Sequence, residues 1–452
     1  MKIYDTLSGK KVDLVPKSPG RVGIYLCGPT VYDYGHLGHG RSAVVFDLLR
    51  RYLMYKGYQV TFVRNWTDID DKTIERAQKE GTSVRELSRR FIRIYQDDFS
   101  RLNLLEPDCA PMPTRHIQDI IDCISRLFQN GHAYVLDDGV YYDISTYQDY
   151  GKLSGQSLDQ LRSGARVEGS EKKRNPGDFV LWKFEKPGEP SWPSPWGRGR
   201  PGWHIECSAM SVRYLGGEFD IHCGGQDLIF PHHEDEIAQA RGAGYPFARY
   251  WMHNGFLNID NEKMSKSLGN FFTLREIFEK FHPLTVRFFL LSAHYRAPLN
   301  FSDYTLRQAE ATLQRYNDFI IRVSEVANES GSGAQREGIS SQVQHIIRRT
   351  REGFIQGMDD DLNVSAALAC VSDVVREVNI MIDREEVSPA EASAVVDVMK
   401  ELNSVMGTFT FEKGILPRDI EKLIAERAEA RKRKDFQKAD SIRELLHNKG
   451  IV

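Results

Sequence analysis

Alternating apolar and polar positions predict a strand over Arg21–Pro29, near the start of the chain. The spacing then changes to that of a helix over Arg41–Lys56, and Gly57 follows where a helix commonly ends. A second strand is predicted over Gln59–Trp66. A strand, a helix and a strand in this order form a βαβ unit, whose two strands are parallel and whose crossover is right-handed.

A second unit of the same kind lies far downstream, with strands over Phe219–His222 and Arg249–Phe256 and a helix over His232–Arg241 between them. The stretch that separates the two units, Cys109–Arg200, has a different character, and turn-forming residues crowd its end at Pro187–Gly202. We therefore predict one doubly wound, Rossmann-like parallel sheet that an insertion splits into two halves.

The chain after about Tyr304 is predicted to be helical. Apolar residues recur every three or four positions along Leu368–Ile382, which is the pattern of one buried helix face. Asn328–Gly338 has the composition of a flexible connection, and a small charged segment follows Phe411. The fold class is thus α/β: a split Rossmann-like domain, then a helical bundle and a small C-terminal domain. The predicted segments are 1–108, the first half of the sheet domain; 109–200, the insertion; 201–256, the second half; 257–304, a region that follows the sheet; 305–410, the bundle; and 411–452, the C-terminal region.

Composition narrows the function classes without selecting one. The 452 residues are 41% hydrophobic and 27% charged, which is ordinary for a globular protein. The strongest apolar run, Val286–Ala293, is too short to span a bilayer, and Met1–Lys11 lacks the apolar stretch of a signal peptide. We expect a cytoplasmic protein without membrane association.

The net charge of -3 gives no overall nucleic-acid signal, but the C-terminal region differs. Phe411–Val452 contains 11 Lys or Arg and 8 Asp or Glu, and Arg431–Lys434 is an unbroken basic run. Composition alone favours a solvated helix face for such a run. A patch that contacts phosphates is the alternative.

A short histidine motif, His36-Leu37-Gly38-His39, follows the first predicted strand and opens the helix. A helix N-terminus attracts phosphate, and Gly38 allows a flat ring or a phosphate to approach the main chain. The pattern HxGH is short, however, and histidines that cap or pack the helix are the commoner explanation when the motif stands alone.

A lysine motif, Lys263-Met264-Ser265-Lys266-Ser267, lies in a polar segment after the second half of the sheet. Two lysines can neutralise the charge that develops on a leaving pyrophosphate, although lysines in a polar segment are usually only solvated. The two motifs together, each at the end of a βαβ half, resemble the HIGH and KMSKS signatures of class I aminoacyl-tRNA synthetases.

Four residues have the chemistry and the placement of zinc ligands: Cys27, Cys207, His232 and Glu236. The first ends a predicted strand, and the last two are four positions apart on one face of a predicted helix. Spacing alone does not separate them from their neighbours His233 and Glu234. Each cysteine taken singly is more simply explained as a buried small side chain, since the six cysteines form no CxxC pairs.

Longer motifs make the resemblance specific. The segments LCGPTVYDYGHLGHGR, NWTDIDDK, PGWHIECSAM, FPHHEDEIAQ and MDDDLN are similar to those of the cysteinyl-tRNA synthetase family, over essentially the whole chain. The resemblance implies a monomeric enzyme that activates L-cysteine with ATP and transfers it to tRNA(Cys). It also implies one zinc ion per chain. The family's ligands fall on Cys27, Cys207, His232 and Glu236, so the resemblance chooses His232 over His233 and Glu236 over Glu234.

The chemistry of cysteine explains why an enzyme that selects this amino acid would use zinc. Cysteine and serine have similar shapes, so a plain pocket separates them poorly. A thiol, with a pKa near ~8.5, loses its proton to zinc far more readily than an alcohol does, and zinc prefers sulfur. The resemblance implies that the substrate thiolate binds the metal directly and that no editing domain is needed.

The resemblance also assigns residues to the substrates. Those implied to stabilise phosphate charge during adenylate formation are His36, His39, Lys263 and Lys266. Those implied to contact ATP, which carries its magnesium, are Thr30, Gly38, His39 and Lys266. Those implied to surround the bound cysteine are Gly28, Thr67, Trp203, His222 and Asp227. Ordinary structural roles, such as a capping threonine, a core tryptophan or a turn aspartate, suit each of the last group equally well when taken singly.

An acidic cluster, Asp68, Asp70 and Asp71, suggests a magnesium site. We favour a helix N-terminus instead, with Thr67 or Asp68 as the cap of a helix that runs to Gly81.

The segment ARKRKDFQKADSIR, residues 430–443, resembles the family's anticodon-reading module. The positions that approach the anticodon fall on Arg431, Phe436 and Asp440, and an aromatic ring beside basic residues suits stacking on unpaired bases. By the same resemblance, the KMSKS motif and stem contacts belong to 257–304, and anticodon binding to 411–452.

Two alternatives remain. Cysteine ligases of the mycothiol pathway resemble the catalytic core but lack the C-terminal module that residues 430–443 resemble here. A non-catalytic RNA-binding paralogue would be expected to lose HIGH or KMSKS residues, and this chain keeps them.

Overall fold

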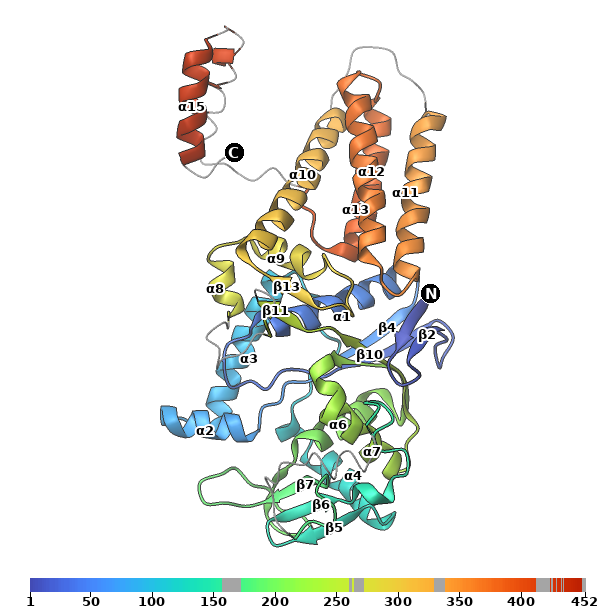
Figure 1. Ribbon diagram of the computed structural model, residues 1–452, viewed down its shortest axis with the longest axis vertical. Coiled ribbons are helices and arrows are strands. Elements are labelled where there is room, and N and C mark those ends of the chain that lie inside the picture. The colour runs from blue at the N-terminus through green and yellow to red at the C-terminus, as the bar shows by residue number, and fades with distance from the viewer. Residues whose placement is uncertain are drawn as a thin grey trace. The chain divides into compact units, whose positions relative to one another are not determined.

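The computed structural model describes residues 1–156, 172–259, 272–328 and 338–411, the main chain of 262–263, and parts of 423–448. The chain divides into two compact units, Met1–Phe409 and Thr410–Val452, and each is described by itself. The larger unit combines a parallel sheet, an antiparallel sheet and a group of long helices (Figure 1).

The parallel sheet has the strand order β10-β9-β3-β4. Its strands are β3 (Arg21–Leu26), β4 (Gln59–Arg64), β9 (Glu218–Gly225) and β10 (Phe247–Asn254). All three pairings are parallel, and Leu26 at the end of β3 lies between Arg64 and Cys223. The split doubly wound sheet is therefore confirmed, and its two halves meet where β3 pairs with β9.

Each half of the sheet has its own helices. In the first half these are α1 (Leu37–Tyr55), α2 (Asp71–Glu80) and α3 (Val84–Arg101). In the second half they are α6 (Trp203–Leu215), the π-helical segment η4 (Ile229–His233) and α7 (Glu234–Gly242). Helix α1 begins four residues earlier than predicted because His36 caps it, and Gly57, with φ +88°, follows its C-cap as expected.

The acidic cluster is a helix start, as favoured, but the predicted cap was wrong. Asp70 is the N-cap of α2: its side chain accepts from the main-chain N–H of Lys72, and Asp71 is the first helical residue. Asp68 instead accepts hydrogen bonds from Thr114, at 2.5 Å from its hydroxyl and 3.2 Å from its main-chain nitrogen. The helix ends at Gly81, in the left-handed region, as predicted.

The insertion folds as an antiparallel sheet in the order β5-β6-β7-β8. Its elements are the 3-10 turn Pro113–Arg115, α4 (Ile117–Gln129), β5 (Ala133–Leu136), β6 (Gly139–Tyr142), the 3-10 turn Ile144–Thr146, β7 (Phe179–Phe184) and β8 (Gly199–Pro201). Apolar residues of α4 and this sheet share one buried core with Ile205 of α6 and Ala238 of α7. The insertion is therefore packed on the two helices that carry two of the four candidate metal ligands described below.

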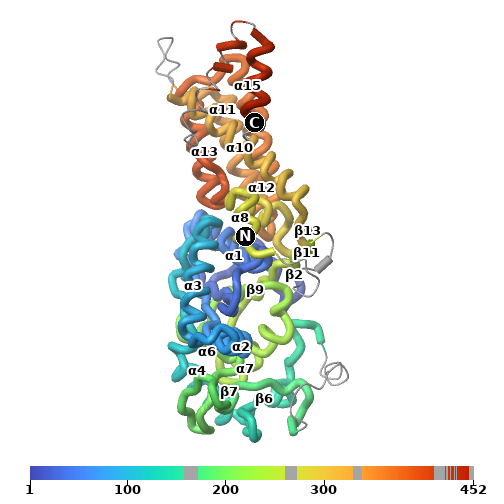
Figure 2. Tube along the Cα trace, turned by 90° about the vertical axis from the view of Figure 1, so that its left-hand side faces the viewer, coloured from blue at the N-terminus to red at the C-terminus, as the bar shows by residue number. Residues whose placement is uncertain are grey.

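Smaller strands and helices connect the sheet to the bundle. They are the hairpin β1 (Lys2–Asp5) and β2 (Lys10–Asp13), the strands β11 (Leu257–Ile259), β12 (Glu262–Lys263) and β13 (Leu299–Phe301), and the helices α8 (Leu274–Phe278) and α9 (Pro283–Leu290). The bundle helices are α10 (Asp303–Asn328), α11 (Ser341–Asp359), α12 (Val364–Asp383) and α13 (Pro389–Met406). In the bundle, α11 packs along α12 and α10 along α13 (Figure 2).

A buried ion pair ties the bundle to α1. Arg287 of α9 lies 2.7 Å from Asp47 of α1, and it donates to the main-chain oxygen of Met406 at the end of α13. The smaller unit contains α15 (Phe436–Asn448), whose apolar face, Ile442 and Leu446, packs with Leu423.

Candidate active site and metal centre

A group of potential metal ligands comes together beside the carboxyl end of β3. Cys27 follows β3 directly, Cys207 lies on α6, His232 lies in η4 and Glu236 on α7. One ligand atom from each lies within 4.8 Å of all the others. Cys207, His232 and Glu236 are almost completely buried. Four residues that are far apart in sequence therefore form one compact donor set.

Their contacts show how the donors face each other. The Cys27 thiol donates to Oε1 of Glu236 at 3.3 Å and lies 3.5 Å from Nε2 of His232. That imidazole nitrogen is 3.0 Å from the same carboxylate oxygen. Two sulfurs, an imidazole and a carboxylate are the donors that zinc takes in tetrahedral sites, so the residues fit a zinc ion.

Neighbouring groups change the ionisation of these donors. The hydrogen bond between the two cysteines lowers the pKa of Cys207 to about 6, while burial and the same hydrogen bond raise the pKa of Cys27, so one of the two sulfurs forms a thiolate near neutral pH. Burial opposes ionisation of Glu236, but His222 and His232 lower its pKa to about 2. Anionic ligands are the forms that bind a metal ion.

Glu234 and His233, the neighbours of the candidate ligands, have other partners of their own. Glu234 points away from the cluster and accepts from the main-chain N–H of Ser154 at 2.9 Å. His233 shares its Nδ1 with His253 at 2.7 Å. A second possible donor set, Cys27, His222, His233 and Glu236, overlaps the first but includes only one sulfur. The set with both cysteines is the softer site and suits zinc better.

A buried hydrogen-bonded relay lies behind His232. Its Nδ1 is 2.8 Å from Nδ1 of His204, whose Nε2 is 3.3 Å from Oδ2 of Asp235. The other oxygen of Asp235 accepts from the Tyr150 hydroxyl at 2.5 Å. Sequence reasoning missed this relay, although His204 and Asp235 stand inside two of the motifs that were singled out.

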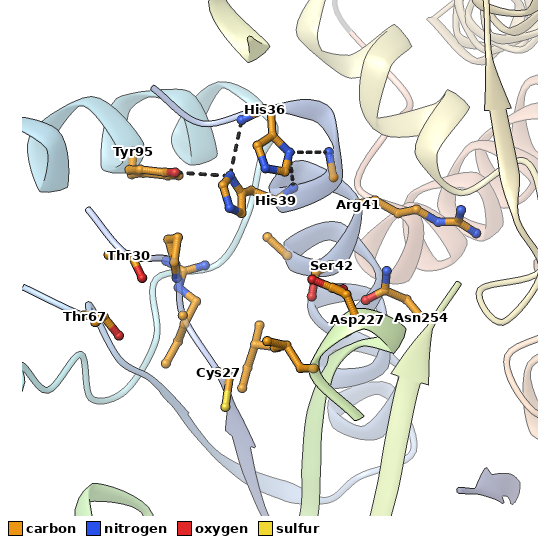
Figure 3. Close-up of a pocket in the computed structure, with 18 of the residues that line it drawn as sticks. Cys27, Thr30, His36, His39, Arg41, Ser42, Thr67, Tyr95, Asp227 and Asn254 are labelled. Atoms are coloured by element: carbon orange, nitrogen blue, oxygen red, sulfur yellow. Dashed lines mark hydrogen bonds between the residues drawn. The ribbon is translucent and has the colours of Figure 1, made fainter. Parts of the chain in front are cut away.

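The histidines of the HIGH-like motif cap α1 and line a cavity at the same time. The His36 side chain accepts from the main-chain N–H groups of Gly38 and His39, and the two imidazole rings stack with centroids 3.6 Å apart. The Tyr95 hydroxyl of α3 lies 3.1 Å from Nδ1 of His39 (Figure 3). The capping explanation is thus correct, and it does not exclude a nucleotide beside the rings.

One cavity of about 490 Å³ joins the histidine motif to the cysteines (Figure 3). The predicted site residues that line it are Cys27, Gly28, Thr30, His36, Gly38, His39, Thr67, Trp203, Cys207, Asp227 and His232. A cavity of this size accommodates a nucleotide-sized ligand. The structure therefore brings most of the predicted substrate and metal residues to one space.

His222 lies behind the residues that line this cavity. Its Nε2 is 2.8 Å from Oε2 of Glu236, its side chain is fully buried, and its ring stacks on Trp251. It thus contacts a candidate ligand, and its predicted contact with the substrate stays a prediction.

Gly28 shows why the main chain comes so close at this point. A Cβ at position 28 would lie 1.6 Å from the main-chain oxygen of Asn65, whose side-chain oxygen accepts from the Gly28 N–H at 2.8 Å. No side chain fits there. Asn65 was not predicted to hold the site, and its place in NWTDIDDK was the available signal.

The described residues that follow the KMSKS motif contact the HIGH-like motif. Lys263 lies in β12, which pairs with β11, while Lys266 and the rest of the motif lie outside the described residues. Where the described chain resumes, the main-chain N–H of Leu274 donates to Gly35 at 2.8 Å, and Thr273 bridges to His36. The segment after KMSKS is therefore anchored on the HIGH-like motif.

The predicted anticodon residues lie in the smaller unit. Phe436 is the first residue of α15 and is 63% exposed. Arg431 is exposed, and Asp440 pairs with Arg443 at 3.2 Å. An exposed phenyl ring at a helix start is available for stacking.

Two sequence families match the chain. The family described as tRNA synthetases class I (C) catalytic domain matches residues 13–311, and the DALR domain matches residues 353–410. The second match covers the region of α11 to α13. None of the helices in the described part of the chain is long and apolar enough to span a membrane.

Named relatives agree with these matches. A cysteine–tRNA ligase of Trichlorobacter lovleyi is 47% identical over 100% of this chain and 97% of its own. One of Geobacter sulfurreducens is 48% identical with the same coverage. Among solved structures, Mycobacterium tuberculosis methionyl-tRNA synthetase in complex with methionyl-adenylate aligns with a TM-score of 0.66 at 17% identity, over 86% of this chain and 92% of its own. At that identity the last similarity concerns the fold alone.

Proposed function

The chain belongs to the cysteine–tRNA ligase family of class I aminoacyl-tRNA synthetases, and from this premise we propose how its cavity activates L-cysteine with ATP and charges tRNA(Cys). One observation carries the proposal: Cys27 and Cys207 line the same cavity as His36 and His39. A cluster suited to a thiol-binding metal and a helix end suited to phosphate thus face one space.

We propose that Cys27, Cys207, His232 and Glu236 hold one zinc ion. When bound, zinc supplies a soft cation that takes up the substrate as a thiolate and discriminates against the serine hydroxyl. The proposal is supported by the donor set, by its burial and by the lowered pKa of Cys207.

Adenylate formation comes first. An oxygen of the cysteine carboxylate attacks the α-phosphorus of Mg-ATP, and the bond to the bridging oxygen breaks as pyrophosphate leaves with the electron pair. Gly38, His39 and Thr30 are proposed to hold the nucleotide. The groups proposed to neutralise the charge that develops on the phosphates are His36, His39, Lys263 and Lys266.

Transfer to tRNA follows. A hydroxyl of the terminal adenosine attacks the carbonyl carbon of cysteinyl-adenylate, the bond to the phosphate oxygen breaks, and AMP leaves. The hydroxyl proton passes to a phosphate oxygen of the departing AMP. The products are cysteinyl-tRNA and AMP.

The remaining cavity residues are proposed to orient the amino acid. Asp227 supplies a carboxylate for the substrate ammonium, and Gly28 and Thr67 border the carboxylate end. Trp203, 39% exposed, covers His232 with ring centroids 4.4 Å apart, and is proposed to shield the thiolate from water. His222 contacts the Glu236 carboxylate and is proposed to position that carboxylate beside the substrate thiolate.

Recognition of tRNA(Cys) is proposed to include base stacking on Phe436, with Arg431 and Asp440 beside the anticodon. We place the enzyme in the cytoplasm as a monomer.

Charging of a tRNA(Cys) transcript with labelled cysteine tests the proposal, with and without a zinc chelator and with serine as a control. We expect ATP-dependent charging by cysteine alone, abolished by chelation and restored by zinc. Charging that survives complete removal of the metal would contradict the zinc assignment. Lys266→Ala should lower cysteine-dependent ATP–pyrophosphate exchange steeply, and unchanged exchange would contradict its role.

A mycothiol-pathway ligase would differ from a tRNA ligase in the molecule that accepts the cysteine, so the role of the C-terminal region distinguishes the two functions. A variant that ends at Phe411 should keep cysteine-dependent exchange and lose most tRNA charging. If it kept full tRNA charging, the C-terminal region would not be needed to read the anticodon. If it lost tRNA charging but kept full cellular activity, the alternative acceptor would gain support.

A further inference from the structure

Arg41 lines the cavity, and its guanidinium points away from His36 and His39 (Figure 3). It is fully buried and donates to three main-chain oxygens: Phe256 at 2.6 Å, Ala297 at 2.5 Å and Tyr295 at 3.3 Å. Burial lowers its pKa to about 10, so the group is still a cation at neutral pH. A planar, forked donor can bridge carbonyls from two segments, which a lysine cannot do.

Arg41 joins two main-chain segments, of which one lines the cavity and the other lies behind the first. The turn Asn254–Leu257, which follows β10, lines the cavity, and the loop Tyr295–Ala297 lies behind that turn. The Gly255 N–H donates to the Tyr295 oxygen at 2.8 Å. A Cβ at position 255 would be 2.5 Å from the Arg296 oxygen, so the two segments are in direct main-chain contact. Movement of the loop would therefore move the turn.

The same loop is fixed from the other side by Asp361, at the foot of the helical bundle. Asp361 is fully buried and has a φ of +62°. One of its oxygens accepts from the Tyr295 hydroxyl and from the Tyr4 N–H, each at 2.7 Å, and the other from Nε of Arg296 at 2.8 Å. A buried carboxylate with this many donors fixes its partners firmly, because each lost bond leaves a buried polar group unpaired.

We propose that Arg41 is a positioning residue for the nucleotide: it holds the turn Asn254–Leu257 in place against the loop Tyr295–Ala297, and Asp361 holds that loop from the bundle. This inference rests on the proposed function, since it takes the ligand of the cavity to be ATP. The bundle and the nucleotide-facing turn are thereby joined through one buried polar chain, Asp361 to Tyr295 and Arg296, and then to Arg41.

The test separates nucleotide binding from stability. Arg41→Lys keeps the charge but loses the fork, and we expect the KM for ATP in cysteine-dependent exchange to rise about tenfold, with the KM for cysteine within about twofold. The matched control is Arg50→Lys in the same helix. Arg50 is also buried and donates to the Glu106 main-chain oxygen and to Asp108, but it does not line the cavity.

Both lysine variants should lower the melting temperature, and only Arg41→Lys should raise the KM for ATP. Equal KM values for ATP in the two variants would overturn the proposal. Absence of cysteine-dependent exchange in the wild-type enzyme would instead contradict the proposed function, so the two failures are distinguishable.

The link to the bundle has its own test. Asp361→Asn removes the charge at the foot of the bundle, and Tyr295→Phe removes one of its donors while keeping the ring. Each should raise the KM for ATP by about three- to tenfold, whereas Asp360→Asn, an exposed neighbour paired only with Lys11 among its described contacts, should change it by less than about twofold.

A double-mutant cycle completes this test. Arg41→Lys and Asp361→Asn together should raise the KM for ATP by less than the product of the single effects, because both loosen the same turn. Strictly multiplicative effects would show two independent sites and overturn the coupling. Tyr295→Phe, the mildest change, replaces Asp361→Asn in the cycle if the latter does not fold.

Discussion

Asp235→Asn tests the relay behind the metal centre. A metal on Nε2 of His232 leaves the proton of that ring on Nδ1, which then donates to Nδ1 of His204 across 2.8 Å. His204 must therefore carry its own proton on Nε2 and donate it to Asp235. Asparagine offers one oxygen for two donors, His204 and Tyr150, so one of them loses its acceptor. The tautomer of His204 that suits metal binding is then no longer fixed.

The structure sets the expected size of the effect. Partners that orient a metal-bound histidine typically change metal affinity by roughly 10- to 100-fold, or about 1.4–2.7 kcal/mol. The 3.3 Å distance between His204 and Asp235 is longer than the optimum for a hydrogen bond, so we expect the lower end, about tenfold. The 2.5 Å contact with Tyr150 makes Asp235 important for stability as well.

The assay is competition for zinc with a chromophoric chelator of known affinity, on protein that has been stripped and reloaded. Asp178→Asn is the control, because Asp178 is equally buried and accepts from a tyrosine hydroxyl, Tyr134 at 2.7 Å, but lies outside the relay. Both variants should lower the melting temperature. If Asp235→Asn bound zinc as tightly as Asp178→Asn and the wild type, the reasoning about the tautomer would be refuted.

Three further predictions concern pH, stability and tRNA. Burial raises the pKa of Asp98 from 3.8 to about 6, so the folded chain holds a proton there that the unfolded chain has lost, and this group's contribution to stability falls as pH rises through that interval. Urea titrations between those pH values should show this loss in the wild type and not in Asp98→Asn, and equal slopes would contradict it. Arg287→Met should cost about 2–4 kcal/mol of unfolding free energy, because the buried Asp47 keeps only Arg51 as a cationic partner among the described residues and the main-chain oxygens of Leu102 and Met406 lose a buried donor, against less than about 1 for the exposed control Arg376→Met; equal denaturant midpoints would be inconsistent with this. Phe436→Ala should raise the KM for tRNA roughly 5- to 150-fold, equivalent to about 1–3 kcal/mol, while cysteine-dependent exchange is unchanged, and Leu445→Ala on the same helix should alter neither; matching effects of the two would speak against stacking.

The sequence predicted the parallel sheet because local patterns suffice for it. Each strand and helix has its own apolar period, and a βαβ connection has one handedness. The ends were less accurate. Two glycines, Gly38 and Gly40, are poor helix formers, and they hid the first turn of α1, which the His36 cap stabilises. The cap of α2 was misplaced by two or three residues because three nearby aspartates have the same chemistry.

The sequence predicted which types of residue form the site, but not how they contact each other. Cysteine, histidine and carboxylate at the right spacing indicated a metal, but choosing Glu236 over Glu234 required the family resemblance. In the structure Glu234 accepts from Ser154, while Glu236 lies within the cluster. For Arg41 the sequence position is misleading about its partners. Its place beside the HIGH-like motif suggests phosphate, and only the fold shows that two of its three acceptors come from a loop more than 250 positions away. Long-range partners of this kind leave no local signal.

The pairing of β3 with β9 has a consequence for how the protein is made. About 190 residues separate the two strands, so at synthesis rates of about 5–20 residues per second the open edge of β3 waits roughly 10–40 s for its partner. Cys27 waits longer, until α7 has left the ribosome. On the proposed zinc assignment the metal would enter late in biosynthesis, and a nascent chain stalled within the insertion would present both an unpaired sheet edge and a lone thiol. Assistance by chaperones during translation should matter most for that interval.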